Sequence, residues 1–174
     1  MESFDLARRR ADEAISLNPH LPGLYTLSGM IQDFAGDEKG AEAALQKAVE
    51  ADPNDFEAQL RFGGVLYRER NLDAAALHLN RALAIKPASP LAHYDLGRVE
   101  REQGQLEAAL KDFEKAVQGD PDWLPPHVAL VALYYRLKRP DDGKREKAIV
   151  DRIKLQHPQQ EPVPETASPQ LPPG

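Results

Sequence analysis

The feature that most constrains this chain is a proline that recurs every 34 residues. It stands at Pro19, Pro53, Pro87 and Pro121. A proline ends the helix before it, because its ring pushes the preceding residue out of the α region and because it has no backbone donor. A fixed spacing of this length is typical of repeat architectures, in which each repeat is one supersecondary unit stacked on its neighbours. The chain is therefore predicted to be a stack of similar units.

Small and large side chains also recur at fixed positions within each unit, counted from three residues after its leading proline. The eighth position holds glycine, the twentieth and twenty-seventh hold alanine, and the twenty-fourth holds a large apolar residue. These residues are Gly29, Gly63 and Gly97; Ala41, Ala75 and Ala109; Ala48, Ala82 and Ala116; and Leu45, Leu79 and Phe113. Small residues at the eighth and twentieth positions let two antiparallel helices approach closely, and the larger residue fills the space beside them.

This order of residue sizes resembles the tetratricopeptide repeat over three complete units, residues 22–121. The family usually has tryptophan at the fourth position, where this chain has Tyr25, Gln59 and His93. The resemblance implies an all-α fold, namely a right-handed superhelical α-solenoid of antiparallel helix pairs.

The predicted solenoid spans residues 1–157. A partial repeat at 1–21 is followed by repeats at 22–55, 56–89 and 90–123 and by a divergent terminal repeat at 124–157. The expected helices are roughly 3–17, 22–35, 38–51, 56–69, 72–85, 90–103, 106–119, 124–137 and 141–156. Residues 158–174 contain six prolines and almost no aliphatic side chains, so a disordered tail is predicted there.

No group of residues in the sequence is typical of a catalytic or cofactor site. The chain has no cysteine, no glycine-rich phosphate loop, no His-Glu-x-x-His and no serine in a nucleophile elbow. His93 and His127 share the fourth position of adjacent units, but a metal site would need further ligands there. The favoured interpretation is that both fill the usual aromatic position. The chain is predicted to have no enzymatic activity, no cofactor and no metal.

Charge and hydropathy give no indication of a nucleic acid or a membrane as partner. The net charge is −6. Residues 136–154 are locally basic, but interleaved Asp and Glu favour a solvated terminal helix over a nucleic-acid or membrane-surface helix. The longest apolar run, residues 128–135, is too short to span a bilayer, and no signal peptide is visible. A cytoplasmic location is the default expectation, with the compartment left open.

The first helices of successive units line the concave surface of such solenoids, which suits a peptide or a partner helix. Positions five, six, nine and twelve of each unit are expected to face it, and they include the Tyr and Arg residues that are enriched in binding hot spots. For Arg98, pairing with acids of its own helix is an equally favoured interpretation. The predicted partner-binding groove contains Met30, Leu60, Arg61, Tyr67, Tyr94, Arg98, Arg101, Val128 and Tyr135.

Two functional classes fit these features. The first is a protein–protein interaction module or scaffold that binds a peptide or helix of a partner. The alternative is the repeat arm of a larger multidomain protein, such as a transferase or a secretion or assembly component, that recruits its substrate. The partial first unit favours the alternative somewhat. It also leads us to expect that Phe4, Leu6 and Ala11 are partly exposed, with fraying or self-association through that edge.

Overall fold

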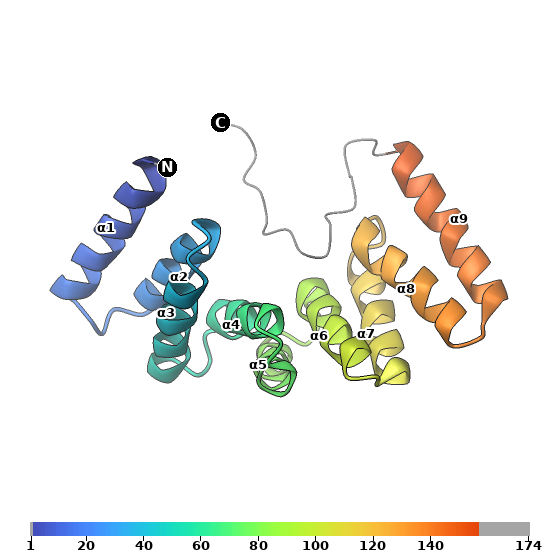
Figure 1. The fold of residues 1–174 in the computed structure, drawn as a ribbon, viewed down its shortest axis with the longest axis horizontal. Helices are drawn as coiled ribbons and strands as arrows, with labels where there is room; N and C mark the ends of the chain where they lie inside the picture. Colours follow the sequence, from blue (N-terminus) through green and yellow to red (C-terminus); the bar gives the residue numbers. More distant parts are fainter. Residues whose placement is uncertain (1, 157–174) are drawn as a thin grey trace. The chain divides into compact units, whose positions relative to one another are not determined.

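The computed structural model describes residues 2–156, with side chains from residue 5 onward. These residues form nine α-helices and no strand (Figure 1). The helices are α1 (Glu2–Leu17), α2 (Leu24–Phe34), α3 (Glu38–Ala51), α4 (Phe56–Arg68), α5 (Leu72–Ile85), α6 (Pro90–Glu102), α7 (Leu106–Gly119), α8 (Leu124–Arg136) and α9 (Pro140–Gln156). The predicted all-α solenoid of helix pairs is confirmed. The tail predicted at 158–174 lies outside the described residues.

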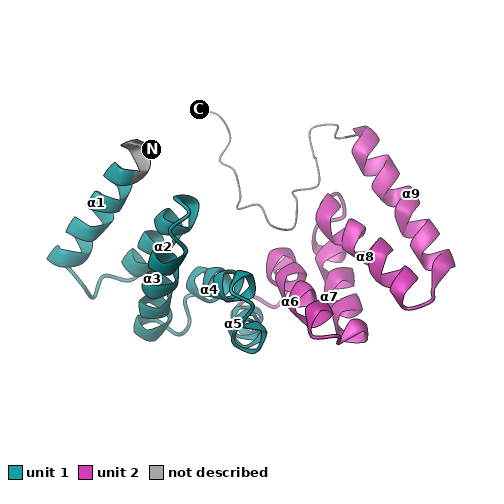
Figure 2. Cartoon of the chain, in the orientation of Figure 1, with its two compact units in different colours: residues 1–85, 166–174 teal, residues 86–165 magenta. Residues whose placement is uncertain are grey.

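The chain divides into two compact units, coloured separately in Figure 2. Among the described residues, unit 1 contains α1–α5 and unit 2 contains α6–α9. In unit 1, α2 pairs with α3 and α4 with α5, while α1 packs on α2 and α3 on α4. In unit 2, α6 pairs with α7, α8 pairs with α9, and α7 packs on α8. No helix in the described part of the chain is long and apolar enough to cross a membrane.

The repeated prolines end helices in the way that the sequence predicts. Asp52 and Asp120, which precede Pro53 and Pro121, have ψ angles of 95° and 90° and have left the α region. Polar residues then begin the following helices: Asp55 accepts a hydrogen bond from the backbone N–H of Ala58 in α4, and Ser89 accepts one from Ala92 in α6. Trp123 occupies the same position before α8 but makes no side-chain cap.

Each helix pair turns through one residue in the left-handed region, at the fifteenth position of its unit. Gly36 and Gly104 adopt φ angles of 78° and 79°, where glycine is at no steric disadvantage. Arg70 and Lys138 adopt φ angles of 65° and 59° at the equivalent points. A non-glycine residue there costs about 1–2 kcal/mol in steric strain, which the packing of the helix pair must outweigh.

The small residues at the eighth and twentieth positions meet as predicted. A Cβ atom added to Gly97 in α6 would lie 2.9 Å from the ring of Phe113 and 3.3 Å from the carbonyl oxygen of Ala109, both in α7. The terminal pair reverses this arrangement. Gly143 of α9 replaces the alanine, and a Cβ there would lie 3.0 Å from the ring of Tyr135 in α8.

The N-terminal helix matches the expectations only in part. Leu6 is 54% exposed, as expected, but Ala11 is buried, with 4% of its surface exposed. The expectation for Ala11 is wrong because α1 packs on α2. The side chain of Phe4 lies outside the described residues.

The adjacent glycines of α4 provide a matched test of this packing. A Cβ at Gly63 would lie 2.7 Å from Cγ of Leu79, whereas nothing lies within 4 Å of a Cβ at Gly64. Both alanine variants gain the same helix propensity, roughly 0.5–1 kcal/mol. We expect Gly64→Ala to raise the free energy of unfolding slightly. In Gly63→Ala, the free energy of unfolding measured by urea denaturation should be about 1–3 kcal/mol lower than in Gly64→Ala. Equal unfolding midpoints would contradict close packing of α4 on α5.

Candidate functional site

The first helices of unit 1 carry four of the predicted groove residues. Met30 of α2 and Arg61 and Tyr67 of α4 are half-buried, so each presents part of its surface. Leu60 is only 3% exposed, which corrects the prediction that it is available to a partner. Leu60 belongs to the buried apolar face of α4.

Polar contacts hold α2 and α4 together within unit 1. The guanidinium of Arg68 in α4 pairs with the carboxylate of Asp33 in α2. The hydroxyl of Thr26 donates to Oδ2 of Asp55 at 2.6 Å, while the other oxygen of Asp55 caps α4. The side chains of these two first helices are therefore presented on a fixed backbone. Arg61 is also restrained, because its Nε donates to Oε1 of Glu57 at 2.6 Å on the same helix.

In unit 2, Tyr94 of α6 lies at the centre of an aromatic cluster. Its ring centre is 4.9 Å from that of Trp123, edge to face, and 5.8 Å from that of Phe113. The guanidinium carbon of Arg98 lies 5.6 Å from the centre of the Tyr94 ring. Trp123 is the single tryptophan of the chain. Part of the predicted groove is therefore a packed stack of aromatic and cationic side chains.

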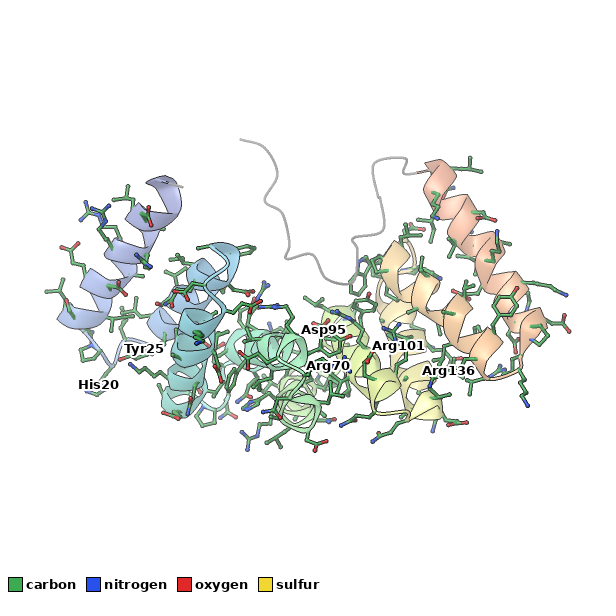
Figure 3. The ribbon with its side chains drawn as sticks, in the orientation of Figure 1. His20, Tyr25, Arg70, Asp95, Arg101 and Arg136 are labelled. Carbon is green, nitrogen blue, oxygen red and sulfur yellow. The ribbon has the colours of Figure 1, made fainter. Side chains whose placement is uncertain are left out.

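The arginines of α6 pair with acids on their own helix. Arg98 Nη1 lies 3.2 Å from Oδ1 of Asp95, and Arg101 Nη2 lies 3.9 Å from Oε1 of Glu102. Asp95 and Arg101 are labelled in Figure 3. The structure thus contains one of the two interpretations considered for Arg98, namely a pair with an acid of its own helix, Asp95. Only about a sixth of each arginine side chain is exposed.

The first helix of the terminal pair contributes an exposed apolar stripe. Val128 is 37% exposed and Tyr135 is 47% exposed, and the exposed Ala132 lies between them. Residues four and seven positions apart lie on the same face of a helix, so the three form one surface on α8. Tyr135 rests against the close-packed Gly143 of α9. The structure thus places Val128 and Tyr135 where a partner can reach them.

Sequence reasoning missed a polar link that recurs at the fourth position of the units. In unit 1, Gln59 Nε2 donates to the carbonyl oxygen of Pro53 at 2.9 Å, and Gln59 Oε1 accepts from Nδ1 of His78 at 2.7 Å. The same two bonds recur in unit 2, where the ring of His93 bridges Pro87 and Asp112 and the ring of His127 bridges Pro121 and Glu146.

This link changes the interpretation of the two histidines. His93 and His127 occupy the aromatic position, but both act as buried hydrogen-bonding bridges, each with 6% of its side chain exposed. The second partner is always 19 residues farther along the chain. Polar residues at the fourth position and again 19 residues later are the sequence signal that could have revealed this link. Within the described residues, no group of three or more His, Asp or Glu side chains could hold a metal ion.

Glu100 extends the link of the α6–α7 pair. Burial raises the pKa of Glu100 to about 8, and the neighbouring carboxylate of Asp112 adds to the shift, while Lys115 opposes it. Asp112 thus accepts from His93 on one side and faces Glu100 on the other. A protonated Glu100 can donate to Asp112, which removes the repulsion between two buried carboxylates.

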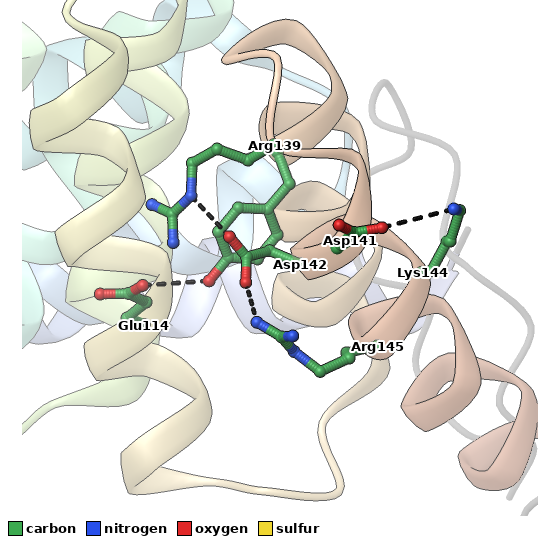
Figure 4. A network of polar contacts seen from close by, with 7 residues as sticks. Glu114, Arg139, Asp141, Asp142, Lys144 and Arg145 are labelled. Carbon is green, nitrogen blue, oxygen red and sulfur yellow. Dashed lines mark hydrogen bonds and ion pairs between the residues drawn. The ribbon is translucent and has the colours of Figure 1, made fainter.

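A second polar network joins α7, α8 and the start of α9 (Figure 4). The hydroxyl of Tyr134 donates to Oε1 of Glu114 at 3.0 Å, and the guanidinium of Arg139 lies 4.9 Å from the Tyr134 ring centre. Arg139 Nε also donates to Oδ2 of Asp142 at 2.7 Å, and Arg145 pairs with the same carboxylate. Four cations of this locally basic region, Arg139, Lys144, Arg145 and Lys147, therefore have acidic partners close by.

Comparisons with known proteins agree with this architecture. Two family models, both described as tetratricopeptide repeat, match residues 29–90 and 90–123. A TPR repeat-containing thioredoxin, TTL4 of Arabidopsis thaliana, is 27% identical over 110 residues, which cover 63% of this chain and 16% of that protein. The chain therefore spans about a sixth of the length of this relative.

Solved structures with the same fold include a double mutant of MamA. It has a TM-score of 0.84 and 25% identity, over 90% of this chain and 88% of that one. YrrB, described as a TPR protein with an unusual peptide-binding site, has a TM-score of 0.76 and 19% identity, over 90% of this chain and 80% of that one. At this identity, the likeness to YrrB concerns the fold alone.

The single tryptophan makes the aromatic cluster measurable. Replacing Tyr94 with Ala removes the ring that packs edge-on against Trp123, so we expect water to reach the indole and its fluorescence emission to shift to longer wavelength. An aromatic pair contributes about 0.5–1.5 kcal/mol beyond its buried area, and we expect at least that loss in the free energy of unfolding. Tyr135→Ala, which changes an exposed tyrosine near the other end of α8, is the control and should leave the emission unchanged. Unchanged emission in Tyr94→Ala would contradict the cluster.

Proposed function

This chain belongs to the tetratricopeptide-repeat family, and from that premise we propose that it binds a peptide or helix of another protein on the faces of its first helices. Repeats of this family are generally non-catalytic interaction scaffolds. The observation that carries the proposal is the exposed stripe of α8, where Val128 and Tyr135 present apolar surface to solvent. The peptide-binding site in the description of YrrB is consistent with such a role.

The chemistry of these faces favours a partner that combines apolar and acidic side chains. Val128, Tyr135 and the Tyr94 cluster supply the apolar and aromatic contacts. Arg61 and Arg98 supply planar guanidinium groups, which match carboxylates in geometry. Both arginines already pair with acids of their own helices, so a carboxylate of the partner has to share or displace these contacts. Each unit is proposed to present its own part of the binding surface, Arg61 on α4 in unit 1 and the other four residues on α6 and α8 in unit 2.

A second candidate function follows from how little of its plant relative this chain covers. Because this chain matches about a sixth of its plant relative, it is also suited to be the repeat arm of a larger protein. In that setting the same helix faces would recruit a substrate to a catalytic or assembly domain elsewhere. The chemistry proposed for the bound segment is the same in both cases, so one experiment on the surface serves both.

The binding surface is testable before a partner is identified. A phage-displayed peptide library is selected on the purified chain, and enriched peptides are titrated calorimetrically. We expect them to combine apolar and acidic residues. Arg61→Ala with Arg98→Ala is expected to weaken their binding at least about tenfold, since a central arginine of an interface contributes ~2 kcal/mol or more. Each single variant then shows what unit 1 and unit 2 contribute separately.

The matched control for charge is Lys47→Ala with Lys115→Ala, two exposed cations on second helices. We expect this double variant to bind nearly as tightly as the unmodified chain. If it loses the peptides while the arginine variant keeps them, the interaction surface lies on the second helices and the proposed faces are wrong.

We also propose that the exposed apolar face of α1 mediates self-association. Leu6 and Leu17 are 54% and 80% exposed, and eleven residues are about three helical turns, so both lie on one face. Sedimentation equilibrium over a concentration series should show association that Leu6→Ser with Leu17→Ser removes. Leu77→Ser on α5, where Leu77 is 51% exposed, is the control and should have no effect. A chain that stays monomeric at high concentration refutes this contact.

A further inference from the structure

The polar links at Gln59 and at His127 differ in whether an ionisable group must hold a proton for both hydrogen bonds to form. The amide of Gln59 has a fixed donor and a fixed acceptor, so it bridges Pro53 and His78 without any ionisation. The ring of His127 instead faces two acceptors, the carbonyl oxygen of Pro121 at 3.0 Å and the carboxylate of Glu146. Both bonds form only if the ring carries two protons, or if the carboxyl group holds the second one.

The surroundings of His127 show which form prevails. Burial lowers the pKa of His127, but the hydrogen bond to Glu146, the bond to the Pro121 carbonyl and the charge of Glu146 outweigh it and raise the pKa above the ordinary value. Arg152 of α9 opposes the shift. On the α7 side, the carboxylate of Glu114 is bound to the hydroxyl of Tyr134. The charged groups that act on the ring thus come chiefly from α9.

Loss of the shared proton leaves an unfavourable contact. A neutral ring that keeps its Nε2 proton for Pro121 presents a lone pair at Nδ1 to the lone pairs of the Glu146 carboxylate. Only 6% of the His127 side chain and 13% of the Glu146 side chain are exposed, so water cannot replace the lost bond without separating them.

The terminal helix contributes few buried side chains of its own to resist that separation. Among its described residues, α9 buries only Gly143, Val150 and Ile153. Val150 and Ile153 form a small core with Leu124 of α8, whereas the larger cluster of unit 2 joins α8 to α7. A weakened link therefore acts first on α9, because a segment with few buried apolar contacts opens at low cost.

We propose that the His127 link makes the α8–α9 pair a proton-dependent closure, in which α9 is held while His127 and Glu146 retain their shared proton and opens more readily once it is lost. The closure is a property of unit 2 and does not depend on what the first-helix faces bind. Its contribution to stability is fully present below the ordinary histidine pKa of about 6.5 and is lost as pH rises through the raised value. Mildly alkaline conditions thus favour release of α9.

The test combines ring titration with local opening in the full chain. NMR of the histidine ring nitrogens between about pH 5.5 and 9 should show His127 titrating above about 6.5. Amide exchange of α9, corrected for base catalysis, should show opening that increases over the same range, by about tenfold for each unit of pKa elevation. His127→Gln with Glu146→His reproduces the Gln59–His78 pair, in which burial lowers the pKa of the histidine. Opening of α9 in this variant should therefore not increase as pH rises.

The exposed His20 provides the matched control, because His20→Gln removes one histidine and no buried link. Its α9 exchange should follow the unmodified chain at every pH. A His127 ring that titrates at or below about 6.5 overturns the proposal, and this measurement needs no variant. Equal pH dependence of α9 opening in the unmodified chain and in the double variant overturns it as well.

Discussion

The close approach of the two helices in each pair is the contact on which the rest of the structure depends. Where Gly63 or Gly97 faces the second helix, the absence of a Cβ lets a buried Leu79 or Phe113 lie directly against the backbone of the first helix. That short separation also brings the fourth position of a unit within hydrogen-bonding distance of a side chain 19 residues later. The apolar contact and the polar link are therefore two results of the same geometry, one supplying most of the burial and the other fixing the register.

The period of 34 residues was enough to predict the helices, their pairing and the sites of close contact, because each depends on residue size and on proline. It was not enough to predict which side chains are buried. Leu60 occupies a position expected to face a partner and is buried, and Ala11, expected to be partly exposed, is buried as well. The roles of His93 and His127 were also missed, since a histidine at an aromatic position has the same size whether it stacks or bridges two acceptors.

The candidate surface combines restrained and exposed side chains. Arg61 and Arg98 are held by acids of their own helices, and Tyr94 is packed between Trp123 and Arg98. Ordering a side chain on binding costs about 0.5–1.5 kcal/mol when it is free to rotate, so side chains already held in place lose less entropy. Tyr135 and Val128 are the more exposed members. On this basis unit 2 offers both the apolar area and the preorganised cation that the proposed partner requires.

The start of α8 has a consequence for how such repeats can diversify. In α4 and α6, a side-chain oxygen of Asp55 or Ser89 satisfies a backbone donor of the first turn. Helix α8 has prolines at 125 and 126, which have no N–H to satisfy, so its capping position does not need an oxygen. That position is filled by Trp123, whose ring packs on Tyr94 instead. Two prolines therefore convert a structural position into one that can vary freely, and a repeat can acquire an aromatic contact there without weakening its helix.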